Sequence, residues 1–407
     1  MRSLWILCVL PLSLDAAADA RAAVVALAPS GVATVAAAPG ERNDLVVDSR
    51  PDGGFVIRDA AASLAAGPGC DAEVGAVACP ASTPLQRMRV TLGDGDDRAN
   101  ITDSTAFWVR VEGGPGADQL VGASDQRGGP GDDRLADGSL LRGGPGGDLL
   151  TAAVGGSSLF GGPGRDRAVG GPGDDSLYDA EPGREAVDVF DGGNGTDHVH
   201  YRQARQPVRI DLAAGTATGG PVQDALNSIE AASGGHAGDL LLGTPESDLL
   251  IGGNGADRLR GLGGDDIVVG RSGDDRLRGG RGDDSLGGYE YGDDRLDGGP
   301  GADELRGEDG ADTLRLGRGD EGEPGAGADR VRVLGPGAAA QAAADWSRDH
   351  LHCRVALAEG HADRGDRVGA RCGKVRRWAV EPLLFPFERG PVPVDRAGTF
   401  ALRAICP

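Results

Sequence analysis

Aspartates recur at a fixed interval in the second half of this 407-residue chain. Between Gly234 and Arg315 the chain consists of nine consecutive units, and each unit of nine residues has an aspartate at its sixth position. The unit that starts at Gly288 is one residue longer and carries its aspartate one place late. These aspartates are Asp239, Asp248, Asp257, Asp266, Asp275, Asp284, Asp294, Asp303 and Asp312. Carboxylates at a constant spacing are typical ligands of a hard cation such as Ca²⁺.

The residues around each aspartate indicate the elements that hold it. Two positions after the aspartate there is an aliphatic residue, as in Arg258-Leu259-Arg260. Such a triplet predicts a very short strand, because side chains alternate between the two faces and only the central one points inward. The glycines of the remaining six residues permit positive φ and let backbone carbonyls converge. We therefore expect leucines inside, arginines outside and an oxygen-lined turn between strands.

The spacing of the units predicts how the aspartates stack. Two nine-residue units form one turn of a flattened coil, so alternate units lie on the same edge. Asp239 and Asp257, which are two units apart, are then neighbours, whereas Asp248 and Asp266 belong to the opposite column. Adjacent turns lie roughly 4.8 Å apart, and carboxylates at that separation repel. Each column therefore requires cations between its rungs.

Calcium is the cation that suits these ligands best. Oxygen donors at flexible spacing favour Ca²⁺ over Mg²⁺, which needs a small octahedral site. The thin leucine stripe does not offset the entropy lost by ordering so many glycines, so we expect calcium binding to supply folding free energy. The alternative is a metal-free coil in which the aspartates only cap turns. Capping alone does not require a carboxylate at the same place in every unit.

The units resemble a known repeat family. GGNGADRLR from Gly252, GRSGDDRLR from Gly270 and GGPGADELR from Gly298 follow the frame GGxGxDxUx closely, where U is aliphatic. This frame is similar to the nonapeptide of RTX (haemolysin-type) calcium-binding repeat proteins, and the resemblance covers the whole stretch from Gly234 to Arg315. It implies an all-β fold, a right-handed parallel β-roll or β-solenoid, in which the repeat aspartates and turn carbonyls hold Ca²⁺ between successive turns.

A second set of units precedes this block. A degenerate unit contains Asp97, and the aspartates of the regular units are Asp118, Asp133, Asp148, Asp166, Asp175 and Asp197. The first three regular units start at Gly113, Gly128 and Gly143, an equal interval that is shorter than two full units. A nine-residue unit therefore alternates with a six-residue one, and we expect only one edge of these coils to carry full metal loops.

The other segments complete a six-part organisation. Residues 1–20 combine Arg2, an apolar run and small residues, which is typical of a cleavable secretory signal. Residues 21–111 alternate like short strands, at 31–35, 44–48, 54–58 and 88–92, and are expected to form an N-terminal β-rich cap. The first repeat block covers 112–200, an irregular strand-turn insert 201–233, and the second block 234–333. A small C-terminal β-rich cap covers 334–407, with a short alanine-rich helix and strands at 375–380 and 399–403.

The cysteines indicate disulfides. Cys70 and Cys79 lie nine residues apart around a polar loop, and we expect them to be bonded in an exported protein. The tail contains Cys353, Cys372 and Cys406. The sequence leaves open whether Cys353 pairs with Cys372 or Cys372 with Cys406.

The histidines are weaker candidates for a site. The tail contains His350, His352 and His361 near two cysteines, and these residue types suit zinc. Their spacing matches no tight structural zinc pattern, so we interpret them as surface or hydrogen-bonded histidines. His198 and His200 flank the central valine of a strand triplet, and we expect both to point outward.

Charge restricts the possible partners. The net charge is −22, and the Gly234–Arg315 block contains 9 arginines against 19 acids, a local charge of −10. We therefore expect no nucleic-acid partner, and no segment after the signal is apolar enough to span a membrane. Carboxylate pairs such as Asp274–Asp275 arise from the repeat, and no GxSxG, HExxH or Walker-type motif occurs. We assign no catalytic residue.

These observations together predict a secreted, extracellular protein that binds several Ca²⁺ ions, folds on binding them and has a structural role at a surface or in a matrix. One alternative is an exported enzyme with its activity in a terminal domain. Another is an adhesin that binds acidic polysaccharide through the outward arginines Arg258, Arg260, Arg276 and Arg278.

Overall fold

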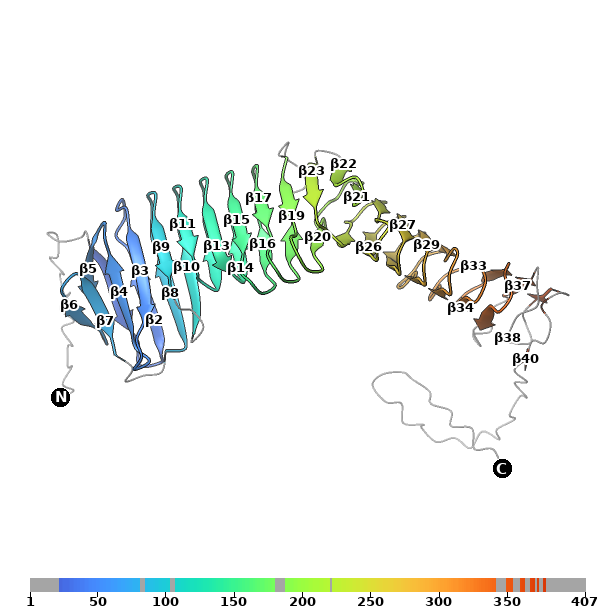
Figure 1. Cartoon of the computed structure of the whole chain (residues 1–407), viewed down its shortest axis with the longest axis horizontal. Coiled ribbons are helices and arrows are strands. Elements are labelled where there is room, and N and C mark those ends of the chain that lie inside the picture. Colours follow the sequence, from blue (N-terminus) through green and yellow to red (C-terminus); the bar gives the residue numbers. More distant parts are fainter. Residues whose placement is uncertain are drawn as a thin grey trace, which may run out of the picture.

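The structure is a computed structural model of the whole chain, and it describes residues 22–80, 85–102, 107–179, 187–219, 222–341, 349–353, 359–362, 367–369, 372, 376 and 377. All regular elements in these ranges are strands. They form an elongated rod whose turns follow one another in chain order (Figure 1). The predicted all-β solenoid is therefore confirmed, whereas the proposed signal at 1–20 lies outside the described residues.

The strands of the rod form two hydrogen-bonded sheets that face each other. The first sheet contains β1 (Ala22–Leu27), β2 (Val32–Ala36), β5 (Ser63–Ala66), β8 (Arg87–Thr91), β10 (Trp108–Glu112), β12 (Asp125–Arg127), β14 (Leu140–Arg142), β16 (Ser158–Phe160), β18 (Ser176–Tyr178), β20 (His198–His200), β24 (Ala231–Ser233), β26 (Leu249–Asn254), β28 (Ile267–Ser272), β30 (Ser285–Gly287), β32 (Glu304–Arg306), β34 (Glu321–Glu323), β36 (Ala339–Gln341), β38 (Glu359–Ala362) and β40 (Arg376–Arg377). We call it sheet A.

The second sheet, sheet B, contains β3 (Asp44–Ser49), β4 (Phe55–Asp59), β6 (Asp71–Glu73), β7 (Ala76–Cys79), β9 (Arg98–Ile101), β11 (Gln119–Val121), β13 (Arg134–Gly138), β15 (Leu149–Ala152), β17 (Arg167–Val169), β19 (Val189–Asp191), β21 (Arg209–Asp211), β22 (Thr216–Gly219), β23 (Val222–Asn227), β25 (Leu240–Leu242), β27 (Arg258–Gly263), β29 (Arg276–Arg281), β31 (Arg295–Asp297), β33 (Thr313–Leu316), β35 (Arg330–Val333), β37 (His350–Cys353) and β39 (Arg367–Val368). From β8 and β9 onward the chain alternates between the sheets, except at β21–β23.

Parallel pairing between successive turns sets the register. In sheet B, Leu241 pairs with Leu259 and Leu259 with Leu277, which is the predicted step of two units. In the first block Leu120 pairs with Leu135, which is the shorter step predicted there. The extra residue of the Gly288 unit leaves this register intact, because Leu277 still pairs with Leu296.

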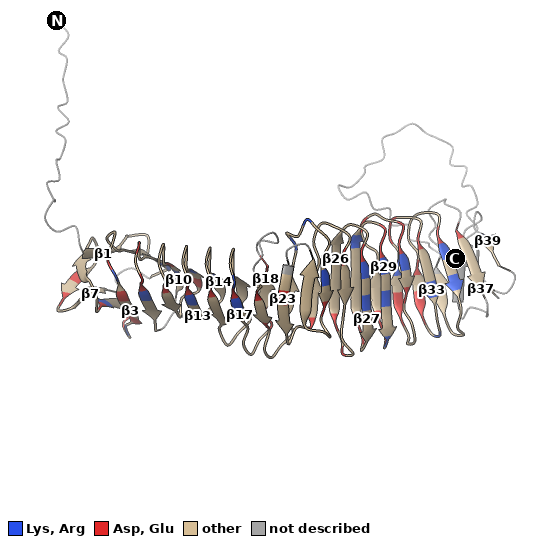
Figure 2. Ribbon diagram, turned by 90° about the horizontal axis from the view of Figure 1, so that it is seen from above, with Lys and Arg blue, Asp and Glu red and all other residues tan. Residues whose placement is uncertain are grey.

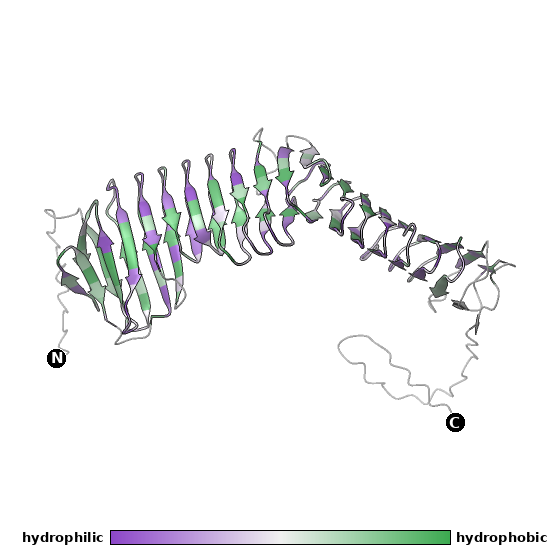
Figure 3. Ribbon diagram, viewed as in Figure 1, coloured by the Kyte–Doolittle hydropathy of each residue, from purple (hydrophilic) through white to green (hydrophobic). Residues whose placement is uncertain are grey.

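A single file of aliphatic side chains from each sheet forms the core. Leu259 and Leu314 of sheet B and Leu250 and Leu305 of sheet A are all 0% exposed. The residues on either side of each of them point out, as strand alternation requires. Hydrophobic residues cover more of each strand at the N-terminal end than in the later coil (Figure 3). The later coil therefore has little apolar surface per residue to bury.

The first strands close the end of the coil with antiparallel hairpins. β1 pairs with β2, β3 with β4, and β4 and β6 both pair with β7. The predicted strands at 31–35, 44–48, 54–58 and 88–92 correspond to β2, β3, β4 and β8. The predicted disulfide between Cys70 and Cys79 is present.

The insert between the repeat blocks continues the coil with an excursion. β19 pairs in parallel with β23, and β21 pairs in parallel with β25. Between them β22 runs antiparallel to both β21 and β23. Within the segment interpreted as an irregular strand-turn insert, the coil therefore contains one antiparallel strand, β22.

The C-terminal part of the coil corrects one expectation. The alanine-rich run was expected to be helical, but its described part is β36, which pairs in parallel with β34. Ala340 is 3% exposed and lies in register with Gly322, so coil pairing and the small inward residue at this rung override alanine's helix propensity. The structure also pairs Cys353 with Cys372; Cys406 and the expected strands at 375–380 and 399–403 lie largely or wholly outside the described residues.

Candidate metal centre

The repeat aspartates lie at the two edges of the coil, each one residue before its strand. Asp257 precedes β27 and Asp275 precedes β29, so the parallel pairing of these strands places the two carboxylates on successive rungs. The Oδ1 atom of Asp275 accepts a hydrogen bond of 2.8 Å from the backbone N–H of Asp257. The same bond joins Asp239 to Asp257 at 2.6 Å and Asp275 to Asp294 at 2.8 Å. Each column is thus a ladder in which one carboxylate oxygen has a backbone donor.

The opposite column and the first block have the same ladder. Asp248 donates to Asp266 and Asp266 to Asp284, each at 2.9 Å. In the first block Asp118 donates to Asp133, and Asp133 donates to Asp148, each at 2.8 Å. The columns expected from sequence are therefore real, but their carboxylates are not wholly unpaired.

The second carboxylate oxygen is different at most rungs. It is buried and accepts no hydrogen bond from the part of the chain that the structure describes. This holds for Oδ2 of Asp97, Asp118, Asp133, Asp148, Asp166, Asp197, Asp257, Asp266, Asp275, Asp284, Asp294, Asp303 and Asp312. A buried polar oxygen without a partner is destabilising, and such atoms recurring along a column mark a place for a ligand.

Three predicted site residues depart from this pattern. Asp175 accepts from the N–H groups of Ser157 and Gly171, so both of its oxygens have donors. Asp239 likewise accepts from Val208 and Gly235. Asp248 accepts at Oδ2 from the backbone and hydroxyl of Thr244, and its Oδ1 has no described partner. These three lie at or near the start of their columns.

The first glycine of each unit leaves open the space beside the orphaned oxygen. A Cβ built on Gly252 would lie 2.3 Å from Oδ2 of Asp257 and 2.8 Å from the carbonyl oxygen of Gly270 in the next turn. On Gly261 it would lie 1.9 Å from Oδ2 of Asp266. Any side chain there would displace the carboxylate. The glycine of the repeat thus keeps a carboxylate oxygen and a carbonyl oxygen of neighbouring turns side by side.

Burial and neighbouring charge make the carboxylates weak acids. Burial raises the pKa of Asp257, Asp266 and Asp275 from 3.8 to about 7. The pKa of Asp294 rises to about 8, because burial is reinforced by the carboxylates of Asp275 and Asp312 above and below it. The backbone hydrogen bond lowers the pKa of each, but less than burial raises it. The charged columns are therefore unfavourable without a cation.

The first block and the ends of the columns follow the same trend. Burial raises the pKa of Asp148 to about 8 and that of Asp118 and Asp166 to about 7. It also raises the pKa to about 6 at Asp133, Asp197, Asp239, Asp303 and Asp312. The pKa values of Asp97, Asp248 and Asp284 are raised by burial as well.

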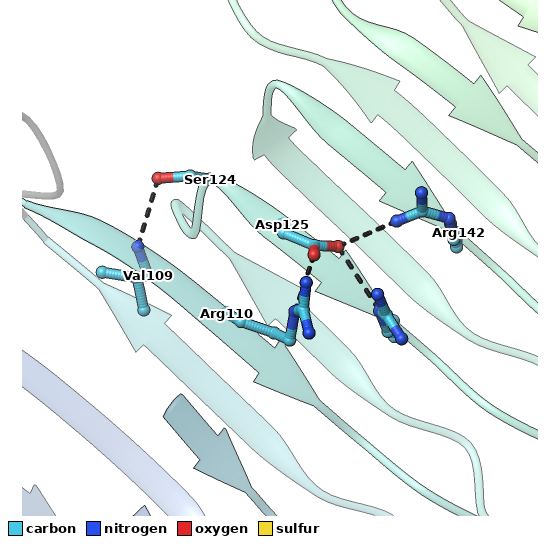
Figure 4. Close-up of polar contacts among 6 residues, drawn as sticks. Val109, Arg110, Ser124, Asp125 and Arg142 are labelled. Carbon is cyan, nitrogen blue, oxygen red and sulfur yellow. Dashed lines mark hydrogen bonds and ion pairs between the residues drawn. The ribbon is translucent and has the colours of Figure 1, made fainter. Parts of the chain in front are cut away.

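Asp125 shows how the protein treats a buried carboxylate where it has its own cations. Asp125 lies on the outward face of β12 and is 1% exposed. Its oxygens contact Arg110 at 2.7 Å, Arg142 at 3.1 Å and Arg127 at 3.6 Å (Figure 4). None of the predicted metal ligands forms an ion pair with a described arginine, lysine or histidine. No described basic side chain therefore neutralises their charge.

The donor set suits a hard cation held largely by backbone oxygens. Within the described ranges no three His, Cys, Asp or Glu side chains converge as a metal-binding group, so carbonyls must supply most ligands. One orphaned carboxylate oxygen per rung, carbonyls and flexible glycine loops fit Ca²⁺. Fifth-position aspartates such as Asp274 and Asp283 are exposed and accept N–H bonds from the next turn, at 3.0 and 2.8 Å.

The structure extends the columns beyond the aspartates that the glycine frame identified. Asp188, Asp224 and Asp320 are buried on the same ladders and accept from Asp166, Asp188 and Asp303. Asp329 and Asp349 continue the ladder past β33, accepting from Asp312 and Asp329. Four of these five aspartates lie two residues before an inward-pointing aliphatic or aromatic residue, and a search of the sequence for this spacing alone, without the glycines, would have found them. The exception is Asp320, which lies two residues before Gly322.

Asn43 occupies the N-terminal rung of the sheet B column. It is 0% exposed, and its backbone N–H donates to Oδ1 of Asp97 at 2.7 Å. Its Nδ2 donates to the carbonyl of Leu92 at 3.1 Å and to Oδ1 of Asp97 at 3.0 Å. At this rung the side-chain amide of Asn43 therefore supplies a hydrogen-bond donor to the oxygen atoms of the edge. The sequence alone did not identify this residue.

Among the described side chains, which do not include that of His361, the histidine and cysteine candidates do not form a metal site. Cys353 and Cys372 are joined in a disulfide, so neither is a thiolate ligand. His350 and His352 lie on the exposed face of β37. His198 and His200 point outward as expected, but they are not open to solvent: their rings stack at 3.7 Å, and His200 is 3% exposed and also stacks on Tyr178. Burial lowers the pKa of His198 to about 4 and that of His200 to about 3.

Comparisons with known proteins agree with this geometry. The family model of the RTX calcium-binding nonapeptide repeat matches in four copies, at residues 141–178, 233–268, 251–286 and 290–320. A search of curated proteins returned no match. Among the described residues no helix could cross a membrane. The coil is a structural, non-catalytic fold, and the chain carries RTX-type calcium-binding nonapeptide repeats.

Proposed function

We propose that this protein is secreted and that its coil folds when Ca²⁺ binds between successive turns. The proposed ligands are the sixth-position aspartates together with turn carbonyls: Asp97, Asp118, Asp133, Asp148, Asp166, Asp175, Asp197, Asp239, Asp248, Asp257, Asp266, Asp275, Asp284, Asp294, Asp303 and Asp312. The observation that carries the proposal is the column of buried Oδ2 atoms without a hydrogen-bond donor among the described residues. Ca²⁺ supplies the positive charge that these atoms lack.

The coupling of binding to folding rests on the same atoms. In the metal-free coil each charged Oδ2 is buried and faces another carboxylate one turn away, which raises the free energy of the folded state. In the unfolded chain the same carboxylates are hydrated. An ion that binds only the folded form stabilises it according to its concentration, and extracellular calcium modules bind at about 10⁻⁴ to 10⁻³ M.

We expect more Ca²⁺ ions per turn in the second repeat block than in the first. There both edges carry the repeat aspartate, whereas in the shorter turns at the start of the first block only the sheet B edge does. On the sheet A edge of those turns the residue before the strand is a serine, Ser124 before β12 and Ser139 before β14. The second block therefore binds more ions per turn than the first.

Circular dichroism of the full chain tests the proposal. In EDTA at pH 8 the β signal is expected to be weak, and it should appear on titration with CaCl₂ at millimolar concentration but not with the same concentration of MgCl₂. A full β signal in EDTA, or an equal response to Mg²⁺, refutes the coupling. Equilibrium dialysis with ⁴⁵Ca²⁺ then measures whether ions are bound at all.

The biological role that fits this fold is structural. A rod with regular outward faces suits a scaffold at a cell surface or in a matrix, and the two disulfides suit an oxidising compartment. The N-terminal segment 1–20 supports general export, and we treat 21–111 and 334–407 as caps of the two repeat blocks 112–200 and 234–333, with 201–233 as the insert between them. An enzyme in a terminal segment is the alternative, and a hydrolase screen of the isolated N- and C-terminal segments discriminates the two.

A further inference from the structure

Arginines form two parallel columns on the outward face of sheet B. Strand pairing aligns Arg258, Arg276 and Arg295 in one column, and Arg260 and Arg278 in the other. Both columns continue through the next rungs, where Thr313 interrupts the first column and Asp297 the second. We call the exposed set the arginine stripe; it consists of Arg258, Arg260, Arg276, Arg278, Arg295, Arg315, Arg330 and Arg332.

The stripe is long and straight. It runs from β27 to β35 and is continued by His350 and His352 on β37. With roughly 4.8 Å per rung, the four intervals between β27 and β35 span about 19 Å along the coil, and the histidines of β37 extend this to about 24 Å. The two columns are two residues apart along each strand, roughly 7 Å. Blue segments recur across β27, β29 and the strands that follow them (Figure 2).

The arginines are confined to one of two equivalent faces. The seventh and ninth positions of the repeat point outward in both sheets. In sheet B these positions hold arginine on most rungs, whereas in sheet A they hold residues such as Leu249, Ile251 and Ile267, which is 51% exposed. Arg306 is the sheet A exception, and it is paired with Glu304 and Glu323. Fold requirements are the same for both sheets, so they do not account for the stripe.

Most charges of the stripe are not neutralised within the described chain. Among the described acids only Asp297 pairs with stripe residues, at 2.8 Å from Arg315 and 3.9 Å from Arg278. Arginines on neighbouring rungs therefore repel one another. Two depressions open on the same face, of about 510 and 480 Å³, and both are lined by Arg315, Arg330 and Arg332. The stripe is a ready anion-binding surface on a chain whose net charge is −22.

We propose that the arginine stripe binds a linear, carboxylate-bearing polysaccharide, whose successive uronate groups lie along the two columns. A guanidinium group donates two parallel hydrogen bonds to a carboxylate, and an extended polyuronate presents one carboxylate per sugar ring. Guanidinium groups on successive rungs of the coil match a polymer whose carboxylates recur along its length. The proposal needs the coil to be folded but does not depend on what folds it.

The borders of the stripe favour a single thin chain over a nucleic-acid duplex. Exposed aspartates flank it at both edges: Asp274 and Asp293 at one, Asp265 and Asp283 at the other. A polymer lying along the strand centres meets the arginines of the stripe, and Thr313 and Asp297 are the only other residues in the two columns between β27 and β35. The phosphates of a wider duplex would reach these aspartates and be repelled.

Binding of a short, fluorescently labelled oligogalacturonate to the full chain tests this assignment. Fluorescence anisotropy is measured at pH 7.5 and low salt, after circular dichroism has shown that the coil is folded. Short oligomers are used because they do not gel with calcium. The methyl-esterified oligomer is the matched ligand control, since it keeps the backbone and removes the charge. Binding is expected for the acid and not for the ester, and it should weaken strongly as salt is raised.

Two triple variants provide the protein control. R276Q/R295Q/R330Q removes three charges from one column of the stripe, and R89Q/R98Q/R134Q removes three exposed arginines elsewhere on the rod. The first is expected to bind about tenfold more weakly, as three exposed ion pairs imply, and the second should bind like the parent.

Four results would overturn the proposal: no binding to the folded chain, equal binding of the ester, equal losses in the two variants, or equally tight binding of duplex DNA. The test stays separate from the calcium proposal. If the coil is folded in EDTA, calcium coupling fails, and the same titration is run on the folded metal-free chain.

Discussion

Replacing Asp275 by asparagine isolates the charge of one rung. Asp275 is 0% exposed, and its Oδ1 accepts the N–H of Asp257 at 2.8 Å. An asparagine can keep that hydrogen bond through its own Oδ1. The substitution therefore removes the negative charge and the orphaned Oδ2 while the backbone ladder stays in place.

The expected effect has opposite signs with and without calcium. Burial raises the pKa of Asp275 from 3.8 to about 7. Because each pKa unit corresponds to about 1.4 kcal/mol, the ionised side chain destabilises the metal-free coil at pH 8 by at most about 4 kcal/mol. Asp275→Asn removes this penalty and should stabilise the metal-free coil. In calcium it removes a ligand, and the affinity of the adjoining sites should fall by about tenfold or more.

Two titrations at pH 8 measure the two signs. In EDTA, trimethylamine N-oxide is added until half of the chain is folded by circular dichroism, because this osmolyte strengthens folding without metal. The variant should need less of it than the parent. In CaCl₂ without osmolyte the variant should need more calcium. Asp274→Asn is the matched control, because Asp274 is exposed and its substitution removes the same charge one residue away from Asp275.

The reasoning is refuted by either of two outcomes. If Asp275→Asn is destabilised in EDTA as well as in calcium, the carboxylate contributes to folding through its hydrogen bond and not through a cation. If Asp274→Asn changes both midpoints as much as Asp275→Asn does, the effect comes from net charge and not from the buried column. A change within about 0.5 kcal/mol is expected for the control.

The columns and the glycines beside them lead to three more predictions. The folded-state pKa values of the column aspartates are raised from 3.8 to about 6–8, so the metal-free coil should gain stability as pH falls from 8 toward 4, while its apparent calcium affinity falls. Titrations of the β signal against pH, in EDTA and in calcium, measure both effects. A β signal in EDTA that stays flat or declines over this range contradicts the argument. Gly270→Ala places a Cβ 2.2 Å from Oδ2 of Asp275 and should weaken calcium binding about tenfold or more. Gly155→Ala, whose Cβ has nothing within 4 Å, should leave calcium affinity unchanged. Calcium titrations compare the two variants, and equal affinities contradict a role for the glycine beside the carboxylate. Asn43→Asp replaces the Nδ2 donor by a second carboxylate beside Asp97. It should lower the free energy of unfolding by about 1–3 kcal/mol at pH 8 and by less at pH 5. Thermal unfolding at the two pH values measures this difference, and a loss of stability that is independent of pH indicates a packing effect instead.

The fold could be predicted from sequence because the repeat encodes it twice. The aspartate interval gives the coil period, and the single aliphatic residue of each triplet gives the inward position, so Leu259 and Leu277 could be placed in register before any coordinates. The one-residue insertion in the Gly288 unit did not mislead the pattern, because the extra residue is absorbed in the loop by Tyr289 and Glu290 at positive φ. Period and inward residue are local signals, and a solenoid has only local contacts.

The site was harder to predict because its chemistry depends on which atoms are satisfied. Sequence showed that Asp257 and Asp275 share a column, but not that one oxygen of each accepts a backbone N–H while the other has no described donor. The two oxygens of one carboxylate have the same sequence context. Asn43 and Asp188 were missed because neither sits in a glycine-rich unit, although both stand at the same rung position as the repeat aspartates.

The ladder of hydrogen bonds also has a direction. In every column the amide of a rung donates to a carboxylate that comes later in the chain, as Asp239 does to Asp257 and Asp294 to Asp312. In a chain synthesised from its amino end, each amide donor is therefore made before its carboxylate acceptor. The hydrogen bond of the last turn forms only when the next turn has been added. The two tips of the rod are consequently inequivalent: cutting away the last coil strands an amide, whereas cutting away the first merely frees an acceptor.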